Sequence, residues 1–366
     1  MPFCRFKCTY CNFASGVFTP REMECYIEAL CAEIRGAKVK GSRADTVYLG
    51  GGTPSILSPA QLERVFAALR SSFDVSGDAE ITLEAAPGSI TPELAGLWQK
   101  LGINRVSLGV QSFVERELKA TGRPHRAETV KRDLALLRQA GIRDANIDLI
   151  AGLPHQTSAG WDQSLDWIAR LRPEHVSVYI LEIDKDSRLG SEVLAGGSRY
   201  SASSLPGDDA TADYYCHAIE RLEEMGCHQY EISNFAIAGH ESRHNRKYWE
   251  HAPYLGFGVD AHSFDGCERW ANADSLDSYL EAAENGRSPV VARHALDERR
   301  QSEERIFLGL RQNRGIELAE EECARYRREI DKMSLAGLLE VSGGTLRLTP
   351  RGRLLSNEVF AEFIET

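Results

Sequence analysis

Three cysteines stand within eight residues near the start of the chain, at Cys4, Cys8 and Cys11, in the spacing C-x3-C-x2-C. A structural zinc ion takes four protein ligands in a closed tetrahedron. Here no fourth cysteine or histidine lies nearby, and Phe13 follows the third cysteine. A 4Fe–4S cube is held by thiolates, usually four. Three thiolates leave one iron with a position that a substrate or cofactor can occupy. The spacing therefore favours such a cluster, with zinc as the weaker alternative.

Polar residues also follow several strand-like runs. Gly50, Gly51 and Gly52 come directly after the apolar run "TVYL", so backbone can approach a ligand closely there. A phosphate-binding turn is the alternative, but neither G-x-G-x-x-G nor G-x4-G-K-[ST] is present. Further along, polar residues lie within or just after three more strand-like runs: Glu84, Gln111 and Asp148. Polar residues at the carboxyl ends of successive parallel strands are typical of the site of a parallel barrel.

The elements that must position these residues alternate between strand and helix. Between residues 45 and 183 a strand-like run is followed by a helical run five times, which predicts parallel strands joined by crossovers. A helix should begin at "SPAQ", where Ser58 and Gln61 form a capping box. The repeat favours a barrel, or part of one, over a doubly wound sheet.

The rest of the chain changes character twice. Residues 184–210 read as a long polar loop, followed by a helix over about 208–226 and an aromatic- and histidine-rich stretch over 240–264. From about residue 296, amphipathic helices and a Gly-Gly hairpin resemble a winged helix. This tail is slightly acidic, so we interpret it as a packing or docking module and not as a DNA-binding one.

Composition narrows the classes of function. The net charge is −11, which argues against a large electrostatic hold on nucleic acid. The longest apolar runs fall short of a membrane span, and the first residues lack a secretory signal, so we expect a cytoplasmic protein. Nine cysteines, three clustered and six scattered, suit metal binding and packing in a reducing compartment. Cys31, at helical spacing, is expected to be buried.

These motifs together resemble the radical S-adenosylmethionine (SAM) superfamily, which combines C-x3-C-x2-C, a following aromatic residue and GGGTP. In that superfamily the open iron is chelated by the amino and carboxylate groups of SAM, and reductive cleavage gives a 5′-deoxyadenosyl radical. Over essentially the whole chain, "LEAAPG", "RVSLGVQSF", "TGRPH", "NIDLIAGLP" and "YEISNFA" are similar to oxygen-independent coproporphyrinogen III oxidase and its relatives.

The resemblance implies roles for individual residues. The cluster would be ligated by Cys4, Cys8 and Cys11. The methionine amino group of SAM would face Gly51, Gly52 and Thr53. The ribose hydroxyls would bind to Glu84 and Asp148. The ribose and the methionine carboxylate would lie against Gln111 and Arg123.

Two branches of this family differ in two places. The oxidase carries a further cysteine two residues after the third, where this chain has Phe13. The haem chaperones lack that cysteine and carry H-N-x-x-Y-W, which this chain matches as "HNRKYW", residues 244–249. The resemblance implies that His244 binds haem, whereas residue types alone also allow a packed surface loop. His240, His251 and His262 are candidates for a second haem ligand, and the sequence does not choose among them.

We therefore expect a haem chaperone with a 4Fe–4S cluster and SAM, which delivers haem to respiratory acceptor proteins at the membrane surface. Haem is the expected ligand, nucleic acid is not expected to bind, and a homodimer is possible. The alternative is a coproporphyrinogen III oxidase, which decarboxylates two propionates to vinyl groups. Radical modification of RNA or of another macromolecule is a third, weaker hypothesis.

The expected fold is α/β, a partial parallel barrel of about six strands with a small C-terminal helical, winged-helix-like domain. The family usually has a strand before the first cysteine, so either the start of this chain is assigned too far downstream or the chain lacks the first barrel strand. Boundaries are expected at 1–183 for the barrel core, 184–285 for an extension carrying the haem motif, and 286–366 for the C-terminal domain. In the run "YLGFGVDAHSF", Asp260 stands where relatives tend to have glycine.

Overall fold

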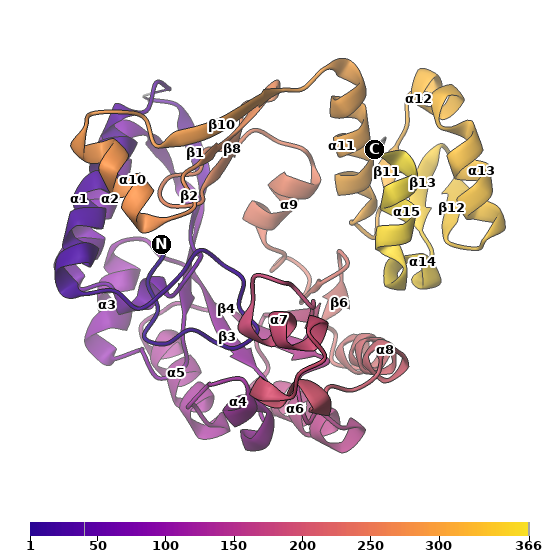
Figure 1. Cartoon of the computed structure of the whole chain (residues 1–366), viewed down its shortest axis with the longest axis horizontal. Helices are drawn as coiled ribbons and strands as arrows, with labels where there is room; N and C mark the ends of the chain where they lie inside the picture. Colours follow the sequence, from indigo (N-terminus) through magenta and orange to yellow (C-terminus); the bar gives the residue numbers. More distant parts are fainter. Residues whose placement is uncertain (40, 365–366) are drawn as a thin grey trace.

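The predicted strand–helix repeats form one twisted, mostly parallel sheet (Figure 1). The computed structural model describes residues 1–39 and 41–364. Five strands pair in chain order, all parallel: β1 (Arg43–Leu49), β2 (Asp74–Ala85), β3 (Arg105–Gln111), β4 (Asp144–Ala151) and β5 (His175–Ile180). Their carboxyl ends meet at one edge, as expected for a partial barrel.

The strand count differs from the prediction of about six parallel strands. Two short strands, β6 (His228–Gln229) and β7 (Asn234–Ala236), extend the sheet beyond β5, which gives seven strands. β7 pairs antiparallel with both β5 and β6. The crossover after β5 does deliver β6 in the parallel direction, but the return strand of a tight hairpin lies between the two.

Helices cover the outer face of the sheet (Figure 1). They are α1 (Pro20–Gly36), α2 (Pro59–Ser72), α3 (Pro92–Lys100), α4 (Glu115–Ala120), α5 (Ala127–Gln139), α6 (Ser158–Leu171) and α8 (Asp208–Glu224), with the short η1 (Pro54–Ile56) before α2. Ser58 and Gln61 form the predicted capping box. Cys31 is buried in α1, as expected, and the largest side chains of this core are Trp98 and Trp161.

The stretch expected as a long polar loop, 184–210, contains helices: α7 (Arg188–Leu194) and η2 (Arg199–Ser204). Ser187 caps α7 by accepting a hydrogen bond from the Gly190 amide. The segment packs on the cysteine loop, since the Leu189 amide donates to the Thr9 carbonyl and Arg188 donates to the Lys7 carbonyl. The loop prediction was wrong because local polarity hides these long-range contacts.

The HNRKYW motif lies on a helix, α9 (Arg243–Trp249), and not on a surface loop. It is followed by a three-stranded antiparallel sheet and one helix: β8 (His262–Phe264), β9 (Glu268–Asn272), α10 (Leu276–Glu284) and β10 (Val290–Ala295). Asp260 has φ 56°, in the left-handed region that favours glycine. This backbone geometry gives a physical reason for a glycine at that position.

The C-terminal part has its own hydrophobic core, which includes Ile306, Leu310, Leu346 and Val359. Its elements are α11 (Glu298–Leu310), β11 (Ile316–Glu317), α12 (Glu320–Arg325), α13 (Arg327–Leu335), β12 (Leu339–Ser342), β13 (Thr345–Leu348), α14 (Pro350–Leu354) and α15 (Ser356–Phe363). The three strands form one antiparallel sheet, and the predicted hairpin turns at Gly343–Gly344, both with positive φ. In the part of the chain that the structure describes, no helix combines the length and apolar character needed to cross a membrane.

Candidate functional site

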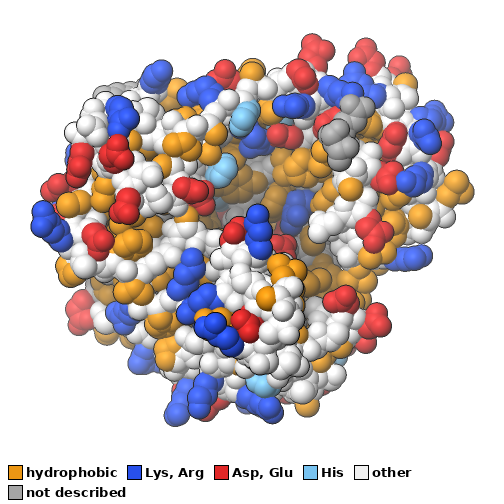
Figure 2. Space-filling model, viewed as in Figure 1, with side chains coloured by type: hydrophobic (Ala, Val, Ile, Leu, Met, Phe, Trp, Pro, Cys, Tyr) orange, Lys and Arg blue, Asp and Glu red, His pale blue; other side chains and the backbone are white. Residues whose placement is uncertain are grey.

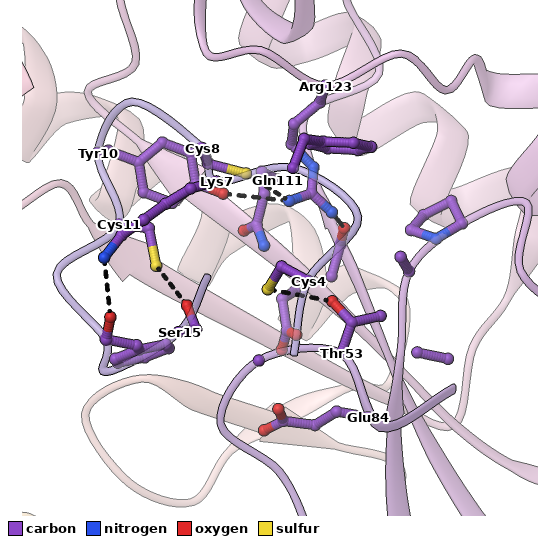
Figure 3. A pocket seen from close by; sticks show the side chains of 18 of the residues that line it. Cys4, Lys7, Cys8, Tyr10, Cys11, Ser15, Thr53, Glu84, Gln111 and Arg123 are labelled. Atoms are coloured by element: carbon purple, nitrogen blue, oxygen red, sulfur yellow. Dashed lines mark hydrogen bonds between the residues drawn. The ribbon is translucent and has the colours of Figure 1, made fainter. Parts of the chain in front are cut away.

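A cavity of about 740 Å³ opens at the carboxyl ends of the parallel strands (Figure 3). Its wall includes ten of the eleven residues predicted for the site. They are Cys4, Cys8, Cys11, Gly51, Gly52, Thr53, Glu84, Gln111, Arg123 and Asp148. These residues come from the N-terminal loop, from the ends of four strands and from the turn before α5, so the fold gathers what the sequence keeps far apart.

The three thiols face this cavity from one loop, and each has a different neighbour (Figure 3). The Cys4 sulfur lies 3.5 Å from the Thr53 hydroxyl, and the Cys11 sulfur lies 3.9 Å from the Ser15 hydroxyl. The Cys8 sulfur accepts a hydrogen bond of 3.2 Å from the Arg123 guanidinium. Among the described residues, no three Cys, His, Asp or Glu side chains converge as ligands of one metal ion. A cube binds each thiolate to a different iron, so its three thiolates need only surround a shared volume.

The glycine-rich loop after β1 needs its glycines. Gly51 has φ 105°, a conformation that side chains disfavour strongly. Its amide donates to the Glu84 carboxylate at 3.0 Å, and the Gly52 and Thr53 amides donate at 2.7 Å to the carbonyls of Met1 and Phe3. The loop is therefore held on both sides, with its backbone at the cavity wall.

Two partly buried carboxylates face the cavity from β2 and β4. Burial raises the pKa of Glu84 to about 7, and burial also raises the pKa of Asp148. Glu84 accepts from the Tyr48 hydroxyl at 2.7 Å, and Asp148 accepts from Ser107 at 3.1 Å and Asn146 at 2.7 Å. A carboxylate has about four lone-pair sites, so each can still accept from hydroxyl groups of a ligand such as a ribose.

Gln111 and Arg123 supply polar groups that this structure leaves without protein partners. The register of β3 with β4 shifts between Gly109 and Gln111, and Gln111 has φ 72°, so a bulge places this side chain at the cavity. Within the described chain, the buried Gln111 Oε1 and Arg123 Nε have no hydrogen-bond partner. Buried polar atoms of this kind are usually satisfied. An acceptor and a donor at one cavity wall fit a polar ligand with both kinds of group.

His244 lies outside this cavity, against the middle of β1 and β2. Its amide and that of Arg243 donate to Glu80 of β2 at 2.8 and 2.9 Å, and Glu80 precedes Glu84 by four residues, about 13 Å along an extended strand. The ring nitrogens lie 2.9 Å from the hydroxyls of Thr46 and Tyr248. Burial lowers the pKa of His244 to about 4, so the imidazole is neutral near pH 7.

The three candidates for a second haem ligand lie in different surroundings. His240 is bound to Asp144, and His262 is exposed, 3.9 Å from Asp260. His251 stacks on Phe264 at 4.4 Å and lines a second cavity of about 210 Å³. That cavity is built largely from aromatic side chains, including Tyr248 and Trp249 of the motif.

Tyr48, which contacts a residue of the first cavity's wall, was not predicted from the sequence. Tyr48 donates to Glu84 and is the residue whose ring stacks on His244. The signal was the period of two in a strand: Tyr48 precedes Gly50 by two residues and so faces the same side. We interpreted "TVYL" only as an apolar run, which hid this polar hydroxyl.

Comparisons with known proteins agree with this geometry. Residues 1–168 match the model of the radical SAM superfamily, and residues 296–355 match that of the HemN C-terminal domain. The chain is 33% identical to "Heme chaperone HemW" of Lactococcus lactis, covering 100% of this chain and 96% of the relative. It is 32% identical to the protein of the same name from Bacillus subtilis, covering 100% and 97%.

Among solved structures, coproporphyrinogen III oxidase (HemN) from Escherichia coli superposes with a TM-score of 0.87 at 25% identity, covering 99% of this chain and 88% of that one. Fold, cysteine loop and C-terminal domain thus agree with the full-length sequence matches. The chain belongs to the HemN-like family of radical SAM proteins that includes the haem chaperones HemW.

Proposed function

We propose that this protein is a haem chaperone that binds haem through His244 and holds a 4Fe–4S cluster and SAM at the barrel mouth. The observation that carries the proposal is the surroundings of His244. A ring that donates Nδ1–H to Thr46 accepts at Nε2 from the Tyr248 hydroxyl. This is the neutral tautomer whose Nε2 lone pair can bind iron, and its Nδ1–H is already oriented by a neighbour, as is common for metal-binding histidines.

The cavity at the strand ends fits the cluster and SAM. Cys4, Cys8 and Cys11 would hold three irons, and the fourth would take the amino and carboxylate groups of SAM. The methionine amino group would face Gly51, Gly52 and Thr53, and the ribose would bind Glu84 and Asp148. Gln111 and Arg123, whose Oε1 and Nε are unsatisfied among the described residues, would complete the contacts to ribose and carboxylate.

The haem side of the proposal has support in the molecular surface. Figure 2 shows the face of the molecule hollowed between the barrel and the C-terminal part, with apolar side chains and histidines at the hollow. Flat aromatic side chains pack well against a porphyrin. The relatives' name, haem chaperone, agrees with this assignment.

Delivery of the haem follows from the same proposal. The acceptors would be respiratory proteins at the membrane surface, reached from the cytoplasm, with a homodimer as one possible state. The net charge of −11 disfavours nucleic acid as a partner.

A second candidate is oxidation of coproporphyrinogen III, favoured by the similarity to the HemN structure. Phe13 argues against it. This side chain is 61% exposed at the cavity wall, where the oxidases are expected to carry a further cysteine.

The proposal is tested by haem titration of anaerobically reconstituted protein, followed through the Soret band. We expect wild type to bind one haem and His244→Ala to lose at least about tenfold in affinity, the free energy of one iron–imidazole bond being well above 1.4 kcal/mol. His228→Ala, which removes an exposed histidine outside the set of candidate haem ligands, serves as the matched control and should bind haem like wild type. Equal haem affinity of His244→Ala and wild type would remove His244 from this role, and turnover of coproporphyrinogen with SAM would favour the second candidate.

A further inference from the structure

One face of β1 connects the two sites. Residues two apart in a strand point to the same side, and here Thr46, Tyr48 and Gly50 share a face. In the parallel pairing with β2, Thr46 lies opposite Glu80 and Tyr48 lies opposite Thr82. The start of this row contacts His244, and its end lies at the cavity of the cysteines.

Tyr48 touches both sites directly. Its hydroxyl donates to Glu84 Oε1 at 2.7 Å, and its ring stacks on the His244 imidazole with centroids 5.1 Å apart and planes at 24°. A Cβ at Gly50 would lie 2.6 Å from Tyr48 Cε1 and 2.9 Å from Glu84 Oε1. The tyrosine and the carboxylate therefore fill the space beside Gly50, which limits where the ring of Tyr48 can move.

The contacts of His244 show which of them an iron would replace. Nε2 faces the Tyr248 hydroxyl, whereas Nδ1 faces Thr46 of β1. An iron bound at Nε2 would take the place of the Tyr248 hydroxyl, and Thr46, the stacked Tyr48 and the edge-on ring of Tyr248 would hold the imidazole. The orientation of the ligand ring then depends on Tyr48, and the orientation of Tyr48 depends on Glu84.

We infer that Tyr48 couples the two sites, so that SAM bound at Glu84 raises the affinity of His244 for haem, and haem raises the affinity for SAM. The inference rests on the proposed function. A ribose on Glu84 immobilises the acceptor of the Tyr48 hydroxyl, which orders the ring against His244. The second ligand then binds a site that is already ordered. Coupling between two binding sites is reciprocal by thermodynamic necessity. Tyr48 acts here as a positioning residue.

The first test needs no haem. Affinity for SAM is measured by equilibrium dialysis for wild type, Tyr48→Phe, His244→Ala and the double variant. Loss of one hydrogen bond predicts a weakening of about 3- to 10-fold for Tyr48→Phe. We expect about threefold for His244→Ala, which removes the stacking partner. The double variant should bind SAM no more weakly than Tyr48→Phe, because loss of the Tyr48 hydroxyl already interrupts the connection between Glu84 and His244.

A matched control distinguishes coupling from general damage. Tyr179 lines the same cavity from β5. If Tyr179 is not coupled to His244, the fold-changes in SAM affinity of Tyr179→Phe and His244→Ala should multiply in the double variant. The inference would be overturned if the fold-changes in SAM affinity of Tyr48→Phe and His244→Ala also multiplied, or if His244→Ala left SAM affinity unchanged.

The second test titrates haem with and without saturating SAM. Wild type should gain about 3- to 10-fold in haem affinity, the same factor as the lost hydrogen bond, and Tyr48→Phe should gain nothing. If wild type binds haem with the same affinity with and without SAM, the coupling is wrong, but the proposed chaperone function is unaffected. The protein could also bind no haem while the effects of Tyr48→Phe and His244→Ala on SAM affinity are still non-additive. That result would support the link between His244 and the SAM site and would overturn the proposed function.

Discussion

Glu84 shows how one partly buried carboxylate can determine ligand binding. It accepts from Tyr48 and from the Gly51 amide, and burial raises its pKa to about 7. A protonated carboxyl group has less capacity to accept hydrogen bonds than a carboxylate. The proposed ribose hydroxyls should therefore bind the ionised form.

This gives a pH dependence of SAM binding. Hydroxyl donors lower the pKa of Glu84 in the complex, so the bound state holds fewer protons than the free state near pH 7. Affinity should fall as the pH drops below about 7, approaching tenfold per unit, and level off above it. Dialysis between pH 6 and 8 measures this, with Glu84→Gln as the comparison. If SAM affinity fell with pH in Glu84→Gln as steeply as in wild type, the titrating group would be a different one.

Placement at the cavity could be predicted for residues that follow a local pattern. The cysteine loop, the glycines after β1 and the carboxylates of β2 and β4 were found because each follows a strand end or a fixed spacing. Tyr48 was missed since its role depends on two partners, 36 and 196 positions away in the sequence. The site of His244 was equally hidden, because helix α9 reaches Glu80 of β2 only through the tertiary fold.

At the scale of elements, the strand–helix repeats and the caps were predictable, and irregular connections were not. Helix α7 contacts the cysteine loop through hydrogen bonds that span more than 170 residues. The return strand β7 depends on a hairpin with only four connecting residues, too short to read from periodicity. Both errors concern contacts that lie outside any local window.

The strands β4 and β5 are linked by a buried histidine. His175 Nδ1 lies 2.7 Å from Asn146 and Nε2 lies 2.8 Å from Tyr230. Burial, together with the nearby positive charge of Arg105, holds the pKa of His175 well below its ordinary value. The folded protein therefore excludes a proton that the unfolded chain accepts below pH 6.5.

Stability should fall as the pH drops below about 6.5, since only the unfolded state gains the proton. Between pH 7 and 5.5 the free energy of unfolding of wild type should fall by about 1 kcal/mol more than that of His175→Gln. Urea titration followed by circular dichroism checks this. His262→Gln, an exposed site, should keep the wild-type dependence, and parallel curves for wild type and His175→Gln would contradict the assignment.

At the scale of the molecule, the C-terminal part joins the barrel through charged and aromatic contacts around α9. Arg311 lies 3.6 Å from the fully buried Glu231, and its guanidinium packs 4.3 Å from the Trp249 ring centroid. Gln312 donates to the Trp249 carbonyl, and Arg314 pairs with the exposed Glu250. The end of the HNRKYW motif is thus part of this contact.

Removing Arg311 should destabilise the protein strongly. Arg311→Met leaves the Glu231 carboxylate buried without its partner, which costs about 3 kcal/mol. The exposed pair makes a matched control, since Arg314→Met should cost less than about 0.5 kcal/mol. Thermal melting compares the two variants. Equal melting temperatures would mean that the buried pair contributes no more than the exposed one.

The position of α9 has a consequence for how its histidine can be exposed. The helix contacts two neighbouring strands, since His244 meets Thr46 of β1 and the amides of Arg243 and His244 donate to Glu80 of β2. Thr46 and Glu80 lie opposite each other in the parallel pairing of these strands, so α9 spans both on one face. A movement of the helix away from that face must break both amide bonds to the Glu80 carboxylate. Release of the proposed haem ligand is therefore tied to a local opening between α9 and the sheet.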